Sequence, residues 1–235
     1  IFFYLMVYIK KKSKGTYRKK PYKKNLLIFG TIFGFSFFLS GIFWITNSLT
    51  FDENFKILIP IALIIIPLFL SLFFGITTLI IGPFLNLNFL SIIIFSGAFA
   101  FSDFIRAKVF TGFPWNLWAY SFSWATEIIQ ILNGIGLFAF NLIIITLFTL
   151  PVVILFNTNN IKKIFTLLFT SLIFVFLYIY GSYLINQNNV ILESKNEKFN
   201  IKVVSPNFDL EYGLSINQIE SRLKKLVRYS EPDKN

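Results

Sequence analysis

The residues of this chain that could do chemistry are few, and the most notable group runs from Asp103 to Tyr120. Asp103 and Arg106 end an apolar run, and a Gly-Phe-Pro-Trp turn follows them. Trp and Tyr prefer the layer where an apolar membrane core meets water, because their rings are apolar and their polar hydrogens still need partners. An ordinary interfacial aromatic belt is one interpretation, and a lipid-contacting motif is the other. The candidate lipid or interface motif comprises Asp103, Arg106, Phe113, Pro114, Trp115 and Trp118.

The chemistry open to the chain is limited by its composition. The sequence contains no Cys and no His, which excludes thiolate or imidazole catalysis and Cys or His metal ligation within these residues. Neither a metal nor a cofactor is expected. Ser and Thr hydroxyls are present, but a hydroxyl needs an adjacent base to become a useful nucleophile. The chain alone is therefore expected to be inactive.

The elements that position these residues are expected to be membrane helices. Hydrophobic residues make up 55% of the chain and charged residues 14%, whereas a soluble domain carries about 25% charged residues. A helix that crosses a bilayer needs about 20 apolar residues. The expected fold over residues 1–185 is an α-helical polytopic membrane bundle with five full spans plus one partial span. The expected spans are about 1–9 (partial), 26–48, 57–81, 88–104, 128–156 and 164–185.

The net charge of +11 is concentrated in one short segment. Nine positive residues and no acid lie between Lys10 and Lys24. A basic segment can bind nucleic acid, but a short basic loop between apolar segments is better explained by the excess of Lys and Arg in cytoplasmic loops. No nucleic-acid partner is expected. Successive crossings place the second basic loop, Asn157–Lys163, on the same side, and they place Thr50–Lys56, Arg106–Glu127 and Asn186–Asn235 outside.

Three local patterns predict how the helices are built and how they meet. Gly30 and Gly34 permit close approach of two helices, and packing within the chain is favoured over dimerisation. Asp103 and Arg106, three residues apart, could pair on one helix face or be solvated separately at the interface. The span at 128–156 is expected to have an irregular start, because its first half contains several Gly and Asn residues.

The two ends of the sequence differ from the expected bundle. Residues 1–9 begin without Met and are expected to be the tail of a helix that starts earlier. Residues 186–235 carry eight positive and seven acidic residues and are expected to be the soluble start of an incomplete domain. Phe199–Val204 alternates apolar and polar residues, which predicts a strand. Ser215–Ser230 predicts an amphipathic helix that opens with a capping box between Ser215 and Gln218.

Several stretches of the sequence resemble one bacterial enzyme family. The run Asp103–Arg106 followed by Phe110–Trp115 (FTGFPW) resembles the acid-x-x-Arg…Phe-Thr-Gly-Phe-Pro-Trp signature of apolipoprotein N-acyltransferases. The segments Gly34–Ile45 and Ile131–Leu137 are similar to that family's third and sixth membrane helices. Val203–Asn207 is similar to the first strand of its nitrilase-type domain.

The resemblance implies an acyltransferase with eight membrane helices and a periplasmic α/β nitrilase-like domain, an αββα sandwich, between the seventh and eighth. This chain would supply the end of helix two, helices three to seven and the beginning of that domain. The family enzyme lies in the bacterial inner membrane. It uses a Glu–Lys–Cys triad to move an acyl chain from a membrane phospholipid to the α-amino group of a diacylated apolipoprotein. The triad residues would lie beyond Asn235, so the resemblance assigns no catalytic residue here.

Three positions depart from the family pattern. Asp103 stands where the family usually has Glu, Ser205 stands where it has Gln, and Glu211–Leu214 stands where Lys-Trp is common. Two other classes of function remain as alternatives: a non-catalytic membrane scaffold or lipid-binding protein, and a transporter. Transporters need polar or ionisable groups near the bilayer midplane. The expected spans carry such groups only at their ends, which makes the transporter the less favoured alternative.

Overall fold

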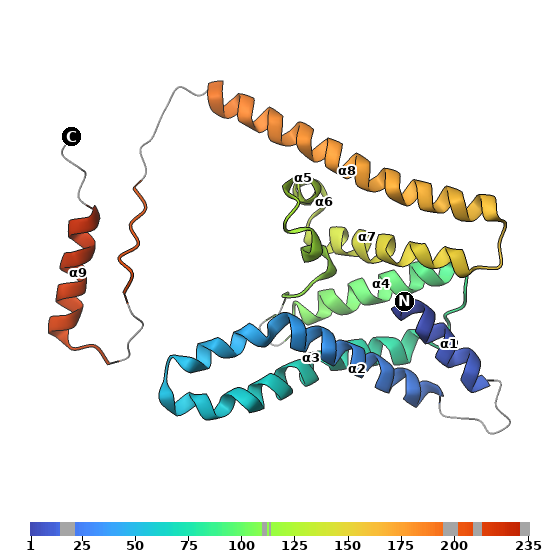
Figure 1. Cartoon of the computed structure of the whole chain (residues 1–235), viewed down its shortest axis with the longest axis horizontal. Coiled ribbons are helices and arrows are strands. Elements are labelled where there is room, and N and C mark those ends of the chain that lie inside the picture. Colours follow the sequence, from blue (N-terminus) through green and yellow to red (C-terminus); the bar gives the residue numbers. More distant parts are fainter. Residues whose placement is uncertain (15–21, 110–111, 113, 195–201, 209–212, 231–235) are drawn as a thin grey trace.

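The computed structural model describes residues 1–14, 22–109, 112, 114–194, 202–208 and 213–230. Within these residues, five helical segments are long and apolar enough to cross a membrane. They are α2 (Tyr22–Ile42) with η1 (Phe43–Thr50), η2 (Glu53–Leu58) with α3 (Ile59–Ile81), α4 (Phe89–Arg106), α7 (Leu137–Thr149) with η4 (Leu150–Leu155), and α8 (Asn160–Ser194). The shorter α1 (Phe2–Lys14) packs beside them (Figure 1). The expectation of a helical bundle with five full spans is confirmed to this extent.

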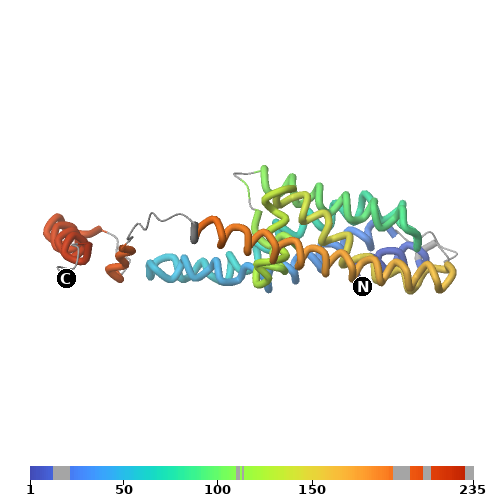
Figure 2. The backbone as a smooth tube through the Cα atoms, turned by 90° about the horizontal axis from the view of Figure 1, so that it is seen from above, coloured from blue at the N-terminus to red at the C-terminus, as the bar shows by residue number. Residues whose placement is uncertain are grey.

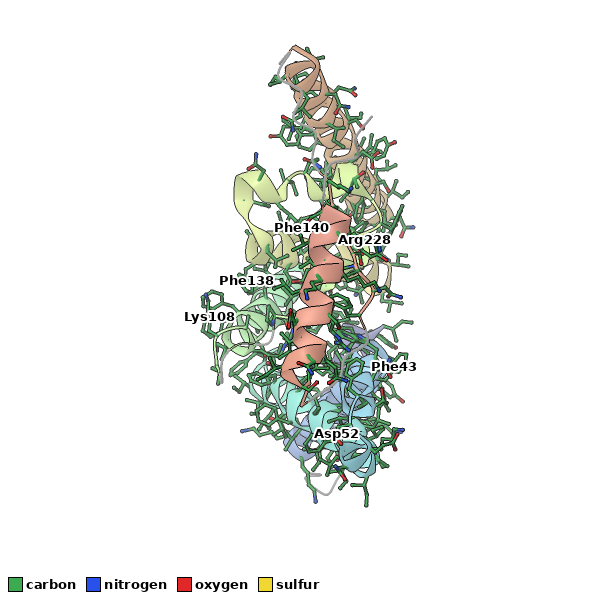
Figure 3. The ribbon with its side chains drawn as sticks, turned by 90° about the vertical axis from the view of Figure 1, so that its left-hand side faces the viewer. Phe43, Asp52, Lys108, Phe138, Phe140 and Arg228 are labelled. Carbon is green, nitrogen blue, oxygen red and sulfur yellow. The ribbon has the colours of Figure 1, made fainter. Side chains whose placement is uncertain are left out.

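The helices of the bundle turn back at two opposite ends (Figures 1 and 2). The C-terminal end of α1, the α3–α4 turn and the η4–α8 turn lie at one end. The η1–η2 turn and the C-terminal ends of α4 and α8 lie toward the other end. Helices α2 and α3, with η1 and η2 between them, form a hairpin, and Asp52, labelled in Figure 3, lies at its tip. This alternation agrees with the order of crossings expected from the sequence.

Glycines allow α2 and α3 to pack closely. A Cβ atom on Gly34 would lie 2.8 Å from Cβ of Phe74, and a Cβ on Gly30 would clash with the side chain of Thr78. Small residues are the usual means by which membrane helices approach each other. The prediction that this pair of glycines serves packing within the chain is confirmed.

Aromatic side chains fill the centre of the bundle. Phe74 of α3 meets Phe38 of α2 and Phe99 of α4, with ring centroids 5.6 and 5.3 Å apart. Both pairs are close to edge-to-face, an arrangement that adds to the stabilisation from buried area. A second cluster surrounds the fully buried Phe140 and joins α7 to α8. The first cluster places α4 between α2 and α7, since it also contains Ile145 of α7.

The span expected at 128–156 is not one continuous helix. Two short helices come first, α5 (Thr126–Ile129) and α6 (Leu132–Ile135), and α7 begins only at Leu137. Gly136 separates α6 from α7 and has φ +77°. Residues with a Cβ rarely adopt that conformation, so the glycine lets the chain change direction there. The irregular start is confirmed, whereas the boundary at 128 is corrected.

Two other boundaries also differ from the expected ones. The basic segment is not one loop, because α1 continues to Lys14 and α2 begins at Tyr22. Lys10 is buried, and its Nζ donates a 2.7 Å hydrogen bond to the carbonyl oxygen of Leu85 at the α3–α4 turn. The last helix, α8, continues to Ser194 rather than ending at 185. The Asn and Gln residues after 185 are polar, but they do not break a helix as Gly or Pro would.

Beyond α8, the described residues contain one helix, α9 (Ile216–Ser230), which lies apart from the bundle (Figure 1). It is the predicted amphipathic helix. Its capping box is confirmed, because the Ser215 N–H donates to Oε1 of Gln218 at 2.8 Å and the Gln218 N–H donates to Oγ of Ser215 at 3.4 Å. Of the strand predicted at Phe199–Val204, residues 199–201 lie outside the described residues. Residues 202–204 are not in a strand, so the start of a nitrilase-like domain stays a prediction.

Candidate functional site

Asp103 and Arg106 form a buried ion pair at the C-terminal end of α4. Nη2 of Arg106 lies 3.0 Å from Oδ1 of Asp103, and the two side chains are only 1% and 5% exposed. Their spacing of three residues places both on the same face of the helix. The paired alternative is therefore confirmed, and separate solvation at the interface is wrong. A buried pair is stable only where further hydrogen bonds satisfy both groups.

Arg106 reaches from α4 to the loop that follows it. This aromatic loop comprises residues 112–122, of which the structure describes Gly112 and 114–122. Nη1 of Arg106 donates a 2.7 Å hydrogen bond to the backbone carbonyl oxygen of Trp115. The guanidinium also lies over the ring of Phe38 in α2, 5.1 Å from its centroid. A planar, forked cation suits both contacts, so one side chain joins two helices and the loop.

Asn141 of α7 completes the network, and the sequence analysis missed it. Its Nδ2 donates to Oδ2 of Asp103 at 2.9 Å, and its Oδ1 accepts the backbone N–H of Ala119 at 3.0 Å. A signal was available: a lone Asn in an apolar run faces the protein interior, because its amide finds partners only there. The expectation that the spans carry polar groups only at their ends is wrong for the span drawn at 128–156.

The aromatic loop exposes one tryptophan and turns another inward. Trp115 is 47% exposed, and its ring packs on Trp44 of η1 with centroids 4.9 Å apart. The ring of Trp118 stacks on Phe37 of α2 at 5.1 Å. Both contacts fix the loop against the C-terminal part of α2 and against η1.

The candidate motif therefore separates into two layers. Its two charged residues lie beneath the loop as part of the buried network. Trp115 lies on the outer surface, whereas Trp118 lies beneath it among the helices. Pro114 is half-buried, and Phe113 lies outside the described residues. Among the described residues of the motif, only Trp115 is exposed.

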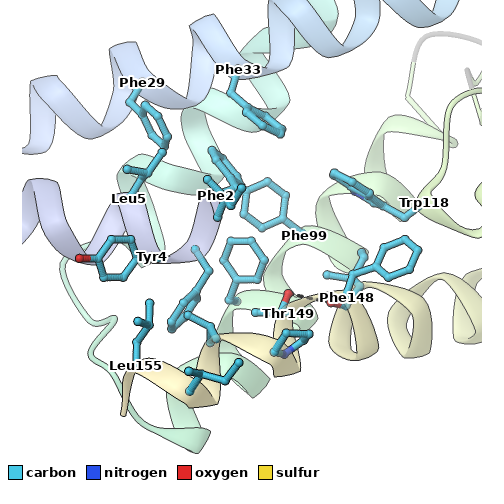
Figure 4. Close-up of a pocket in the computed structure, with 17 residues that line it drawn as sticks. Phe2, Tyr4, Leu5, Phe29, Phe33, Phe99, Trp118, Phe148, Thr149 and Leu155 are labelled. Atoms are coloured by element: carbon cyan, nitrogen blue, oxygen red, sulfur yellow. Dashed lines mark hydrogen bonds between the residues drawn. The ribbon is translucent and has the colours of Figure 1, made fainter. Parts of the chain in front are cut away.

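An apolar pocket of about 790 Å³ lies below Trp118, between α1, α2, α4 and α7 (Figure 4). That volume is within the range of small-molecule sites. The phenylalanines around it are Phe2, Phe3, Phe29, Phe33, Phe95, Phe99 and Phe148. Thr149 is one of its few polar side chains, and its hydroxyl already donates to the carbonyl of Ile145 at 2.7 Å. The lining suits a hydrocarbon group rather than a polar substrate.

Reactive groups are scarce around the network. No cluster of three or more acidic, His or Cys residues that could hold a metal occurs among the described residues. Partial burial raises the pKa of the Tyr120 phenol above its ordinary value, and the positive charge of Arg106 acts in the opposite direction. The phenol is therefore protonated near neutral pH. The arrangement can position an apolar or amphipathic group, but the network contains no activated nucleophile.

Five helical segments of the described residues are long and apolar enough to cross a membrane, and this is the class of multi-pass helical membrane proteins. The family model described as the apolipoprotein N-acyltransferase N-terminal domain matches residues 2–150. The chain therefore belongs to the apolipoprotein N-acyltransferase family.

Relatives of the chain carry the same family name. The apolipoprotein N-acyltransferase of Rickettsia bellii is 35% identical over 157 residues, covering 65% of this chain and 30% of the relative. That of Rickettsia typhi is 32% identical, covering 68% and 32%. That of Allorhizobium ampelinum is 26% identical, covering 77% and 33%. The chain thus spans about a third of the length of these relatives. No solved structure matches the chain.

Proposed function

We propose that this chain is the membrane part of an enzyme that transfers an acyl chain from a phospholipid to the α-amino group of the diacylglyceryl-cysteine of a lipoprotein. The observation that carries the proposal is the aromatic loop, fixed by the buried network at the end of a bundle of this family. Amphipathic rings at a membrane surface contact lipid headgroups. A fixed loop with Trp115 on its outer surface would present such a ring where both substrates arrive.

The proposed location is the bacterial inner membrane, with the tail 186–235 in the periplasm. The end of α1 and the start of α2 carry several lysines and no acid. Cytoplasmic ends of membrane helices are enriched in Lys and Arg. With that end in the cytoplasm, the aromatic loop and the end of α8 lie on the periplasmic side.

The proposed reaction needs residues that this chain does not contain. A base takes the proton of a thiol, and the thiolate attacks the ester carbonyl of the phospholipid. The ester C–O bond breaks as the thioester forms, and the leaving oxygen takes the proton from the base, which releases a lysophospholipid. The lipoprotein amine then attacks the thioester, an amide forms, and the thiolate leaves with the proton passing to a base. Because the sequence has no Cys, we assign the nucleophile and its Glu and Lys partners to a nitrilase-like domain beyond Asn235 in a longer enzyme.

The role left to the bundle is to anchor that domain and to receive hydrocarbon. Seven of the 17 residues that line the apolar pocket below Trp118 are phenylalanines. An acyl chain that moves there from the bilayer leaves one apolar environment for another, so no polar group has to lose water. The pocket and the exposed ring of Trp115 lie on the two sides of one fixed loop.

A chimaera tests the proposal. Residues 2–150 of this chain would replace the matching part of the Rickettsia bellii apolipoprotein N-acyltransferase. The chimaera should transfer a labelled acyl chain from phospholipid to a synthetic diacylated lipopeptide. A folded chimaera without transfer would contradict the proposal.

Substitution of Trp115 tests the role of the loop in the same chimaera. Trp115→Ala should lower transfer more than it lowers folded yield, because the ring is half exposed. Trp124→Ala is the matched control, since Trp124 is 79% exposed and donates only within its own turn, to the carbonyl of Ser121. Unchanged transfer per folded molecule after Trp115→Ala would show that the loop has a structural role and does not contribute to acyl transfer.

A further inference from the structure

We propose that Asn141 is a positioning residue for the aromatic loop, and that it acts through the direction of its two hydrogen bonds. Its amide nitrogen donates to Asp103, and its amide oxygen accepts from the backbone of Ala119. The role of Asn141 in placing the loop concerns the bundle alone and does not depend on the proposed function. The consequence for acyl transfer rests on the proposed function.

The two neighbours of Asn141 impose opposite requirements. An ionised carboxylate only accepts hydrogen bonds, and a backbone N–H only donates them. The side chain between Asp103 and Ala119 must therefore donate on one side and accept on the other. A leucine would fill a similar volume but leave both groups unsatisfied. An aspartate would keep the shape but bring a second carboxylate against the first.

The two bonds of Asn141 control both ends of a five-residue segment. Ala119 is held directly, through its N–H. Trp115 is held indirectly, because Asn141 orients the carboxylate of Asp103 and that carboxylate pairs with the Arg106 guanidinium that binds the Trp115 carbonyl. All three side chains of the network are buried. In such surroundings a lost partner is not replaced by water, so the cost of an unsatisfied group is high.

An exchange of two side chains separates hydrogen-bond direction from packing. In the double variant Asp103→Asn/Asn141→Asp, the amide at position 103 accepts from Arg106 and donates to the carboxylate at position 141. That carboxylate accepts the N–H of Ala119. All three bonds and the net charge are therefore retained. Each single substitution instead leaves two amides or two carboxylates facing each other, beside a buried cation.

The position of the loop can be measured with introduced thiols, because the chain has no native Cys. A Trp44→Cys/Trp115→Cys pair reports loop docking, since those rings are 4.9 Å apart. A Phe104→Cys/Phe138→Cys pair reports packing of α4 on α7, since those rings are 5.2 Å apart. Each pair would be treated with a short thiol cross-linker in the whole chain, held in phospholipid nanodiscs.

The single variants Asp103→Asn, Asn141→Asp and Asn141→Leu should lower the ratio of cross-linked to free loop about tenfold, the effect of one unsatisfied buried group. The α4–α7 pair should still cross-link, and the exchange variant should restore loop cross-linking. The inference is overturned if the single variants dock the loop as the parent does. Loss of both cross-links together, or failure of the exchange to restore docking, would also overturn it.

The same variants in the chimaera distinguish this inference from the proposed function. The single variants should lower kcat/KM for acyl transfer in step with loop cross-linking, and the exchange should restore it. If docking is lost and regained while transfer stays constant, the role of Asn141 stands and the role of the loop in transfer is contradicted.

Discussion

Nη1 of Arg106 lies 2.7 Å from the carbonyl oxygen of Trp115, so the last side chain of α4 binds the backbone of the loop that follows. A cation in the last turn of a helix also faces the negative end of the helix dipole. The contact fixes where the chain goes after it leaves the helix. This guanidinium is therefore one of the groups that set the direction of the aromatic loop.

Replacement of Arg106 should release the loop and destabilise the bundle. Arg106→Ala leaves the carboxylate of Asp103 buried without its cation, a change that costs about 3–5 kcal/mol. Arg106→Lys keeps the charge but lacks the planar fork, so it should fall between Ala and the parent. Thermal unfolding in nanodiscs, followed by tryptophan fluorescence, measures both effects.

Lys108→Ala provides the matched control for Arg106. It removes the same charge two residues further on, from an exposed position. Surface substitutions change stability by about 0.5 kcal/mol or less. Equal stability of Arg106→Ala and Lys108→Ala would show that the buried ion pair does not hold the loop.

The helices and the possible pairing of Asp103 with Arg106 could be predicted from the sequence, because both depend on local spacing. A bilayer sets a minimum length for an apolar run, which identified the helix that carries Asp103 and Arg106. Their spacing of three residues predicted that they could meet. Burial of the pair could not be predicted, because it depends on Asn141, which lies 38 residues from Asp103 in the sequence. Only the packing of α7 on α4 brings the amide to the carboxylate.

Helix boundaries were less predictable for a related reason. Lys10 lies in a run of positive residues that predicts a solvated loop, yet its ammonium binds the carbonyl of Leu85 on a distant turn. Gly136 lies within an apolar run that satisfies the length of a span, yet its positive φ ends one helix before the next begins. In both cases the deciding partner or backbone angle comes from tertiary structure.

Packing of α2 on α3 should be sensitive to a single methyl group. Gly34→Ala would place a Cβ atom 2.8 Å from Cβ of Phe74, and overpacking of this kind costs about 1–3 kcal/mol. Gly97→Ala is the control, because no atom lies within 4 Å of the added Cβ. Thermal unfolding in nanodiscs should show a lower midpoint for Gly34→Ala only. Equal midpoints would mean that the two helices separate easily.

The sidedness of the bundle can be tested with single cysteines at exposed positions near the ends of the helices. Asn54→Cys and Ser123→Cys should react with an impermeant thiol reagent in intact spheroplasts. Lys24→Cys and Thr158→Cys should react only after the membrane is opened, because the basic end is expected in the cytoplasm. All four positions are exposed in the structure. A thiol that fails to react is therefore separated from the reagent by the membrane and is not hidden inside the protein. Labelling of Lys24→Cys in intact spheroplasts would reverse the proposed orientation.

The chain by itself should neither form an acyl-enzyme nor transfer an acyl group. It has no Cys and no His, and a Ser or Thr hydroxyl needs a base within roughly 3 Å to become a nucleophile. The buried carboxylate of Asp103 is already bound by Arg106 and Asn141, so it is not placed to take that proton. The measurement is incubation of the purified chain with labelled phospholipid, followed by a diacylated lipopeptide. Stable, stoichiometric labelling of the chain would show that it holds a nucleophile of its own.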